Sequence, residues 1–159
     1  MRKRNICILD TSWLLVMDDL QENIVISIVS PWEEHPECLW HHDNCYMFEC
    51  DEMAKWDSSK LPFTDKDCRI IEELLSGNEL DMVVIHCKDC GPRGQGIALA
   101  LLEHIWWESM WRELFSLHMN GKRTHRAKVT IGSRSSVEKN PDRDIYSTLS
   151  KWFSRDSAL

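Results

Sequence analysis

Two residues near the middle of the chain, Cys87 and Arg93, have the types and the spacing to act on phosphate. A cysteine thiolate is a strong nucleophile, and a guanidinium presents a planar fork that binds two phosphate oxygens at once. Gly91 and Gly94 allow backbone amides to approach an anion, and the first turn of a following helix adds unpaired N–H groups. The same field favours loss of the thiol proton. These residues predict an anion-binding loop with a nucleophile at its base.

Such a loop must be held between a strand and a helix. Residues 80–86 are predicted to form a buried strand, because they are apolar and rich in β-branched side chains. Residues 97–105 are helix-forming and apolar on nearly every face, which predicts a central helix. Residues 87–96, with three glycines and a proline, are predicted as the loop between them. A strand, a glycine-containing loop and a helix form the context that a phosphate-binding motif requires.

The rest of the chain alternates between strand and helix patterns. Thr64 and Asp67 form a capping-box pattern, and Gly77 is placed to end the helix that follows it. Further strands are predicted at 5–9, 24–29 and 45–50, with a doubtful one at 129–131. Further helices are predicted from a cap at Asp10, Thr11 or Ser12 through Leu20, at 106–118, and from Asn140-Pro141 to Trp152. The alternation predicts one α/β domain over residues 1–159, with a central, mainly parallel sheet flanked by helices.

Composition excludes several classes of protein. The net charge of −7 over 159 residues argues against a broad nucleic-acid-binding face. No apolar run approaches the roughly 20 residues of a membrane span, and acidic residues interrupt the segment after the basic start, so neither a membrane partner nor a signal peptide is expected. Without a secretory signal, the seven cysteines are expected to be free thiols. We therefore expect a cytoplasmic protein.

The segment from His86 to Arg93, His-Cys-Lys-Asp-Cys-Gly-Pro-Arg, resembles the signature of the cysteine-based protein tyrosine and dual-specificity phosphatases. In that signature five residues separate the cysteine from the arginine. The likeness extends to residues 25–31, 48–51 and 140–146 and to the helix before the signature strand. In these parts the chain is similar to small tyrosine-phosphatase-like proteins of bacteria and their phages.

The resemblance implies a phosphatase-like fold and hydrolysis of a phosphate monoester through a phosphocysteine intermediate, with no metal or organic cofactor. Cys87 takes the role of nucleophile, Arg93 that of phosphate ligand, and His86 orients Cys87 and helps to ionise it. Asp51 is the first choice for the acid that protonates the leaving group, with Glu52 and Asp57 as alternatives. Phosphate is expected to contact the loop at Lys88, Asp89, Cys90, Gly91, Arg93 and Gly94.

Three loop residues depart from the family pattern. Cys90 stands in place of a usual glycine, and Gly94 in place of a serine or threonine that helps the thiolate to leave. Pro92 lacks an amide that would donate to phosphate. Each change is expected to slow catalysis by about 10–100-fold, the effect of a lost hydrogen bond of roughly 1.5–3 kcal/mol. The alternative function is therefore a catalytically degenerate module that binds a phosphorylated protein or a host protein.

The substrate class stays open at this point. Phosphotyrosine, phosphoserine, a nucleotide and an RNA end all carry the phosphate monoester that such a loop recognises. If the chain is encoded by a phage, the expected location is the host cytoplasm.

Other patterns allow further interpretations. Cys87 and Cys90 also form a Cys-x-x-Cys pair, which is typical of thioredoxin-like redox sites or of a protective reversible disulfide. Six residues have spacings that suit zinc, although a loop with buried thiols is the favoured interpretation: His35, Cys38, His41, His42, Cys45 and Cys50. Trp106, Trp107 and Trp111 are expected in the core or at an oligomer contact. The basic residues within 122–128 are expected in a solvated loop, with a docking patch as the alternative.

Overall fold

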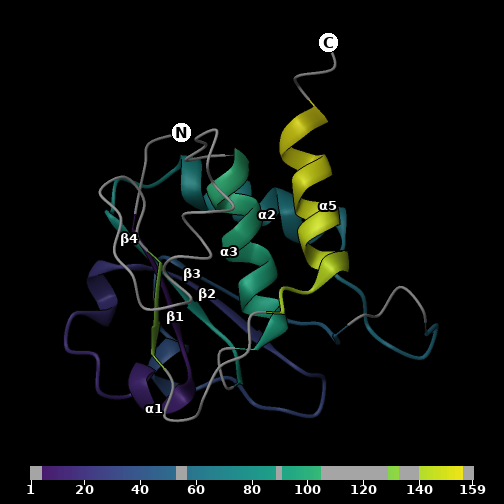
Figure 1. Cartoon of the computed structure of the whole chain (residues 1–159). Coiled ribbons are helices and arrows are strands. Elements are labelled where there is room, and N and C mark those ends of the chain that lie inside the picture. Colours follow the sequence, from purple (N-terminus) through teal and green to yellow (C-terminus); the bar gives the residue numbers. More distant parts are fainter. Residues whose placement is uncertain (1–4, 53–56, 89–90, 105–128, 133–139, 156–159) are drawn as a thin grey trace.

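A sheet of five parallel strands forms the centre of the computed structural model, which describes residues 5–52, 57–88, 91–104, 129–132 and 140–155 (Figure 1). The strand order is β3-β2-β4-β1-β5, and every neighbouring pair is parallel. The strands are β1 (Asn5–Leu9), β2 (Ile24–Val29), β3 (Cys45–Glu49), β4 (Met82–His86) and β5 (Val129–Gly132). The predicted α/β class with a parallel sheet is confirmed for the described residues.

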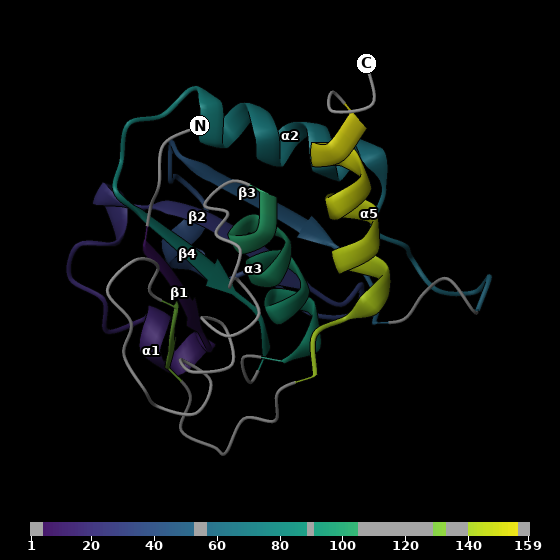
Figure 2. The same ribbon diagram turned by 45° about the horizontal axis from the view of Figure 1, so that its top comes forward.

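Helices cover both faces of the sheet. Three of them, α2 (Asp65–Ser76), α3 (Pro92–His104) and α5 (Arg143–Ser154), lie on one face, with α3 and α5 side by side (Figure 2). The short helix α1 (Thr11–Leu14) lies on the other, next to two 3-10 turns at Leu20–Glu22 and Glu37–Leu39. Among the described residues no helix combines the length and the apolar character that crossing a membrane requires.

The alternation of side chains along β2 explains why both faces are covered. Ile24, Ile26 and Ile28 point into a cluster that includes residues of α2, α3 and α5, whereas Val25 packs with Leu14 on the opposite face. All six residues of β2 are buried. A strand that is apolar on both sides needs a layer on each of them, as parallel sheets generally do.

The chain leaves the neighbouring strands β2 and β4 in opposite directions. From β2 it runs to the edge strand β3 across the face that carries α1, and from β4 it enters α3 on the other face. The carboxyl ends of β2 and β4 therefore form a topological switch point, the position at which open α/β sheets generally bind ligands. Ser27 and His86 are paired across this end of the two strands.

Most predicted elements are confirmed. The strands at 5–9, 24–29 and 45–49 form, and α2 begins at Thr64 with both hydrogen bonds of the capping box present. Helix α5 starts from Asp142, whose side chain accepts from the amides of Asp144 and Ile145. The doubtful segment at 129–131 is strand β5, paired with β1. The segments predicted at 106–118 and 122–128 lie outside the described residues.

Two boundaries were predicted wrongly. Helix α3 begins at Pro92 and not at Ile97, because proline is favoured in the first turn of a helix, where its missing N–H costs nothing. Arg93 therefore belongs to the first turn of the helix. Helix α1 ends at Leu14, because the next amides, those of Val16 and Met17, bond three residues back and turn the chain.

Candidate active site

Cys87 follows β4 directly and lies beneath the first turn of α3. Its amide donates to the carbonyl of Leu9 at 3.3 Å, and its thiol lies 3.8 Å from the carbonyl oxygen of Gly91. The side chain is fully buried. A Cβ added at Gly94 would meet Cys87 Sγ at 2.6 Å, closer than real Cβ contacts allow. Glycine at 94 is therefore what allows the helix to begin directly over the sulfur.

Burial raises the pKa of the Cys87 thiol to about 11. A backbone hydrogen bond from Gly94 and the charge of Arg93 act in the opposite direction, and the carboxylate of Glu52 adds to the rise. The expectation of a readily ionised thiol was wrong, because the loss of hydration outweighs the helix amide and the guanidinium. As the site stands, the thiol carries its proton at neutral pH.

Arg93 extends its buried guanidinium to the ends of β2 and β3. Its Nη1 donates to the hydroxyl of Ser30 at 3.0 Å and to the carbonyl of Cys50 at 2.9 Å. Two carboxylates lie close by, with Glu33 Oε1 at 3.8 Å from Nη2 and Glu52 Oε1 at 3.9 Å from Nε. Two segments that lie far from Arg93 in the chain, residues 30–33 and 50–52, thus meet around one fixed positive charge at the switch point.

The three candidate acids lie in different surroundings. Glu52 has a contact to Arg93, and its carboxylate lies 3.8 Å from the position a Cβ would take at Gly91. Asp51 instead accepts a hydrogen bond from the amide of Leu61 at 2.8 Å. Asp57 bonds the amide and hydroxyl of Ser59, which lowers its pKa. Of the three, Glu52 is the carboxyl that the structure brings to the arginine.

His86 lies on the opposite face of the sheet from Cys87, as neighbours in a strand do. Its Nδ1 is 2.9 Å from Ser27 Oγ and its Nε2 is 2.8 Å from Thr11 Oγ1, while Ser27 Oγ also meets His35 Nδ1 at 3.1 Å. Burial lowers the pKa of His86 to about 4. The ring is therefore neutral at pH 7 and faces away from the thiol, and the prediction that His86 orients Cys87 and helps to ionise it was wrong. It ties the ends of β1, β2 and β4 together.

The neutral His86 predicts a loss of stability in mild acid. In the unfolded chain the ring has a pKa near 6.5, so that between this value and about 4 the unfolded state binds the additional proton. The free energy of unfolding should therefore fall as the pH drops through this window, by about 2–3 kcal/mol at pH 4.5. Urea denaturation at pH 7 and pH 4.5 measures the difference.

The matched variants for this experiment are His86→Gln and His41→Gln. His41 is exposed, so its replacement should leave the acid-dependent loss unchanged. Replacement of His86 should remove most of it, at the cost of a lower stability at pH 7. A His86→Gln protein that loses as much stability in acid as the parent would contradict this assignment.

The remaining loop and ligand predictions have different outcomes. Gly91 and Gly94 lie around Cys87, and Lys88 is exposed. Asp89 and Cys90 are outside the described residues, and with them any Cys87–Cys90 pair.

The predicted zinc ligand His42 has other partners in the structure. Its Nε2 donates to the carbonyl of Leu20, and its Nδ1 accepts from the amide of Asn44. In the described parts of the chain no three His, Cys, Asp or Glu side chains gather as a metal site would need.

Ser30 and Glu33 were not predicted from sequence. Glu33 accepts from the amide of Ser30 at 2.9 Å, and both side chains contact Arg93. Their position in the sequence could have indicated them, because Ser30 is the first residue after a buried strand. The carboxyl ends of parallel strands are where such sheets place functional side chains.

Known proteins offer no independent guide to this site: no family model, curated protein or solved structure matches the chain. The functional assignment rests on the residues of the site.

Proposed function

We propose that the chain is a phosphate-monoester hydrolase of the cysteine-dependent phosphatase type, with the corresponding phosphatase-like fold. One observation carries the proposal. The sulfur of Cys87 lies under the amide of Gly94 at the start of α3, and the guanidinium of Arg93 extends from the same helical turn to the switch point. A nucleophile, a helix N-terminus and a fixed cation at one sheet edge suit attack on a phosphoryl group.

In the proposed reaction the Cys87 thiol first loses its proton to bulk water, and the thiolate attacks phosphorus, so that an S–P bond forms as the P–O bond to the leaving group breaks. Glu52 gives its proton to the departing oxygen. Water then attacks phosphorus and gives a proton to the Glu52 carboxylate, the S–P bond breaks, and inorganic phosphate leaves with the Cys87 thiolate and the Glu52 acid regenerated. Arg93 binds the phosphoryl oxygens in both steps, and for this it exchanges its contacts with Glu33 and Glu52 for contacts with the substrate.

A second candidate is a module that binds a phosphorylated partner without turning it over. Three observations favour it. The raised pKa of Cys87 leaves little thiolate at neutral pH, and Nη1 of Arg93 already donates to two protein oxygens. Gly94 also lacks the hydroxyl that would help the thiolate to leave.

Trapping of the intermediate separates the two candidates. The full chain is incubated with p-nitrophenyl phosphate, quenched in acid, digested and analysed by mass spectrometry. A hydrolase is expected to release p-nitrophenol, to carry phosphate on the peptide that contains Cys87, and to be inhibited by vanadate. Absence of both product and phosphocysteine would overturn the proposed hydrolysis, and protection of the Arg93 segment by inorganic phosphate would then support the binding module.

A further inference from the structure

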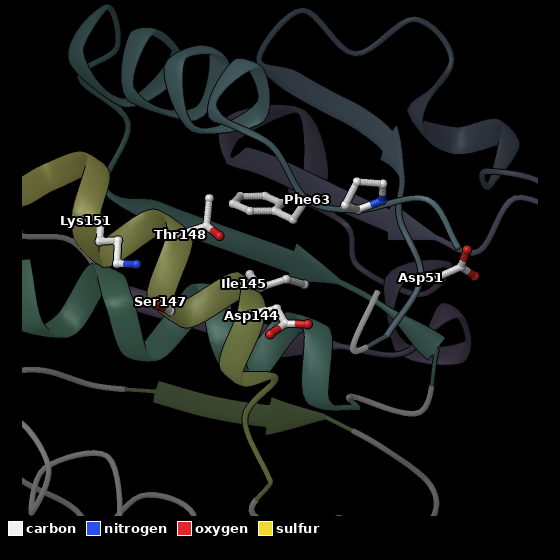
Figure 3. Close-up of a pocket in the computed structure, with 8 residues that line it drawn as sticks. Asp51, Phe63, Asp144, Ile145, Ser147, Thr148 and Lys151 are labelled. Carbon is white, nitrogen blue, oxygen red and sulfur yellow. The ribbon is translucent and has the colours of Figure 1, made fainter. Parts of the chain in front are cut away.

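A cavity of about 280 Å³ lies between helix α5 and the segment that leads from β3 to α2 (Figure 3). Phe63 and Ile145 form its apolar middle, and Thr148 faces Phe63 across it. All of its lining residues are described, and neither Cys87 nor Arg93 is among them. The cavity is therefore distinct from the proposed phosphate site.

The charges of the cavity are separated along its length. Asp51 and Lys151 lie at opposite ends in Figure 3, with Asp144 between them at the start of α5. Asp144 and Lys151 are seven residues apart on one helix, which places their backbone positions about 10.5 Å apart along the axis. A complementary ligand carries a positive group and a negative group at about this distance, with an apolar stretch between them.

This distance selects the kind of ligand. A free amino acid is too short, because its ammonium and carboxylate are attached to the same carbon. In a polyproline II segment, residues i and i+3 lie on the same side of the chain and about 9 Å apart. A short peptide in polyproline II conformation, basic at one end and acidic three residues later, matches the cavity.

The acidic end of the cavity is next to the proposed phosphate site. Asp51 stands between Cys50, whose carbonyl accepts from Arg93, and Glu52, whose carboxylate lies 3.9 Å from the same side chain. A peptide whose basic residue reaches Asp51 and Asp144 would bring a neighbouring residue towards Glu52 and Arg93.

We propose that the α5 cavity binds the substrate as a peptide, with a basic side chain at Asp51 and Asp144 and an acidic side chain at Lys151. The inference rests on the proposed function, because it makes the substrate a phosphorylated protein whose phosphorylated residue is next to the basic one. Nucleotides and RNA ends lack this pattern of charges.

The test uses fluorescein-labelled peptides of two sequences, phosphotyrosine-Lys-Pro-Pro-Glu and its charge-swapped form phosphotyrosine-Glu-Pro-Pro-Lys, each also made with plain tyrosine. Binding to the full-length Cys87→Ser protein is measured by fluorescence anisotropy, so that the phosphorylated probes stay intact. The Lys-Pro-Pro-Glu peptides are expected to bind about tenfold more tightly than the swapped ones. Phosphorylation is expected to tighten the binding of both.

Lys151→Glu should abolish or reverse this preference, whereas Lys66→Glu should leave it unchanged. Lys66 is exposed on α2 and does not line the cavity, so the second variant makes the same change of net charge elsewhere. Lys151→Gln provides a milder variant if the charge reversal disturbs folding, and it should abolish the preference without reversing it.

The two proposals fail in different ways. Equal affinity for the two sequences, or a preference that survives both Lys151 variants, overturns the peptide site. A charge preference that persists while phosphorylation adds nothing supports the cavity as a peptide site and overturns its connection to a phosphate site.

Discussion

Replacement of Cys87 by serine is expected to lower the rate of p-nitrophenyl phosphate hydrolysis by about a thousandfold or more. A serine hydroxyl fits the space of the buried thiol, but it is a far weaker nucleophile, and the neighbouring His86 cannot act on it as a base because its ring points to the other face of the sheet. The measurement is kcat/KM of the purified parent and variant proteins, with circular dichroism to verify the fold.

Two further expected results make this prediction specific. Cys38→Ser, a change at a half-buried thiol that the structure places away from the Arg93 contacts, should retain the parent rate. With p-nitrophenyl phosphate, whose weakly basic p-nitrophenolate leaves without a proton from Glu52, the parent rate should rise by up to about tenfold per pH unit from pH 6 to 9, because the thiolate fraction grows with pH below the pKa of about 11. A rate unaffected by Cys87→Ser would exclude the phosphocysteine route.

Arg93→Ala is expected to lower the free energy of unfolding by about 3 kcal/mol. The change leaves the Ser30 hydroxyl and the Cys50 carbonyl without their buried donor and removes the positive charge beside Glu33 and Glu52. The carboxylates are partly exposed, so most of the cost is expected from the two lost hydrogen bonds. Urea denaturation followed by tryptophan fluorescence provides the measurement.

Arg155→Ala is the matched control for this loss. Arg155 pairs with Glu72 at 2.9 Å and lies over the ring of Trp152, but it is exposed, so its removal should cost no more than about 1 kcal/mol. Arg93→Lys should recover part of the stability, because the ammonium keeps the charge but reaches fewer of the acceptors. If Arg93→Ala and Arg155→Ala were equally stable, Arg93 would not hold the switch point together.

The parts of the fold that were predicted correctly depend on local signals. Helix α2 is bounded by Thr64 and Gly77, each of which acts within a few residues, and β2 is recognisable by its run of β-branched residues, interrupted only by Ser27. The start of α3 was missed because Gly94 and Gly96 favour a loop when considered locally. In the structure a Cβ at Gly94 would meet the sulfur of Cys87, and a Cβ at Gly96 would meet the backbone of Asp142. These contacts depend on the tertiary fold, so they cannot be predicted from the residues around each glycine.

The site was predicted in part for a similar reason. The pair of Cys87 and Arg93 was identified from spacing alone, whereas the groups that surround Arg93 come from segments around 30 and 50 that only the sheet topology brings together. The acidity of Cys87 was misjudged because a sequence shows which charges are near, but not how completely water is excluded. The α5 cavity likewise depends on how α5 packs against the segment before α2, and no sequence motif predicts it.

The close fit of Gly94 over the sulfur also limits how this chain can change. A serine or threonine introduced there would collide with the very atom it is meant to assist, and its Cβ would lie in tight contact with Ile8 and Ile85, 3.3 Å from each. A faster descendant therefore cannot arise by that one substitution. Directed evolution for turnover would first have to select smaller side chains on β1 and β4, at Ile8 and Ile85, so that the sulfur can move away from residue 94. Only afterwards would a hydroxyl at this position be beneficial.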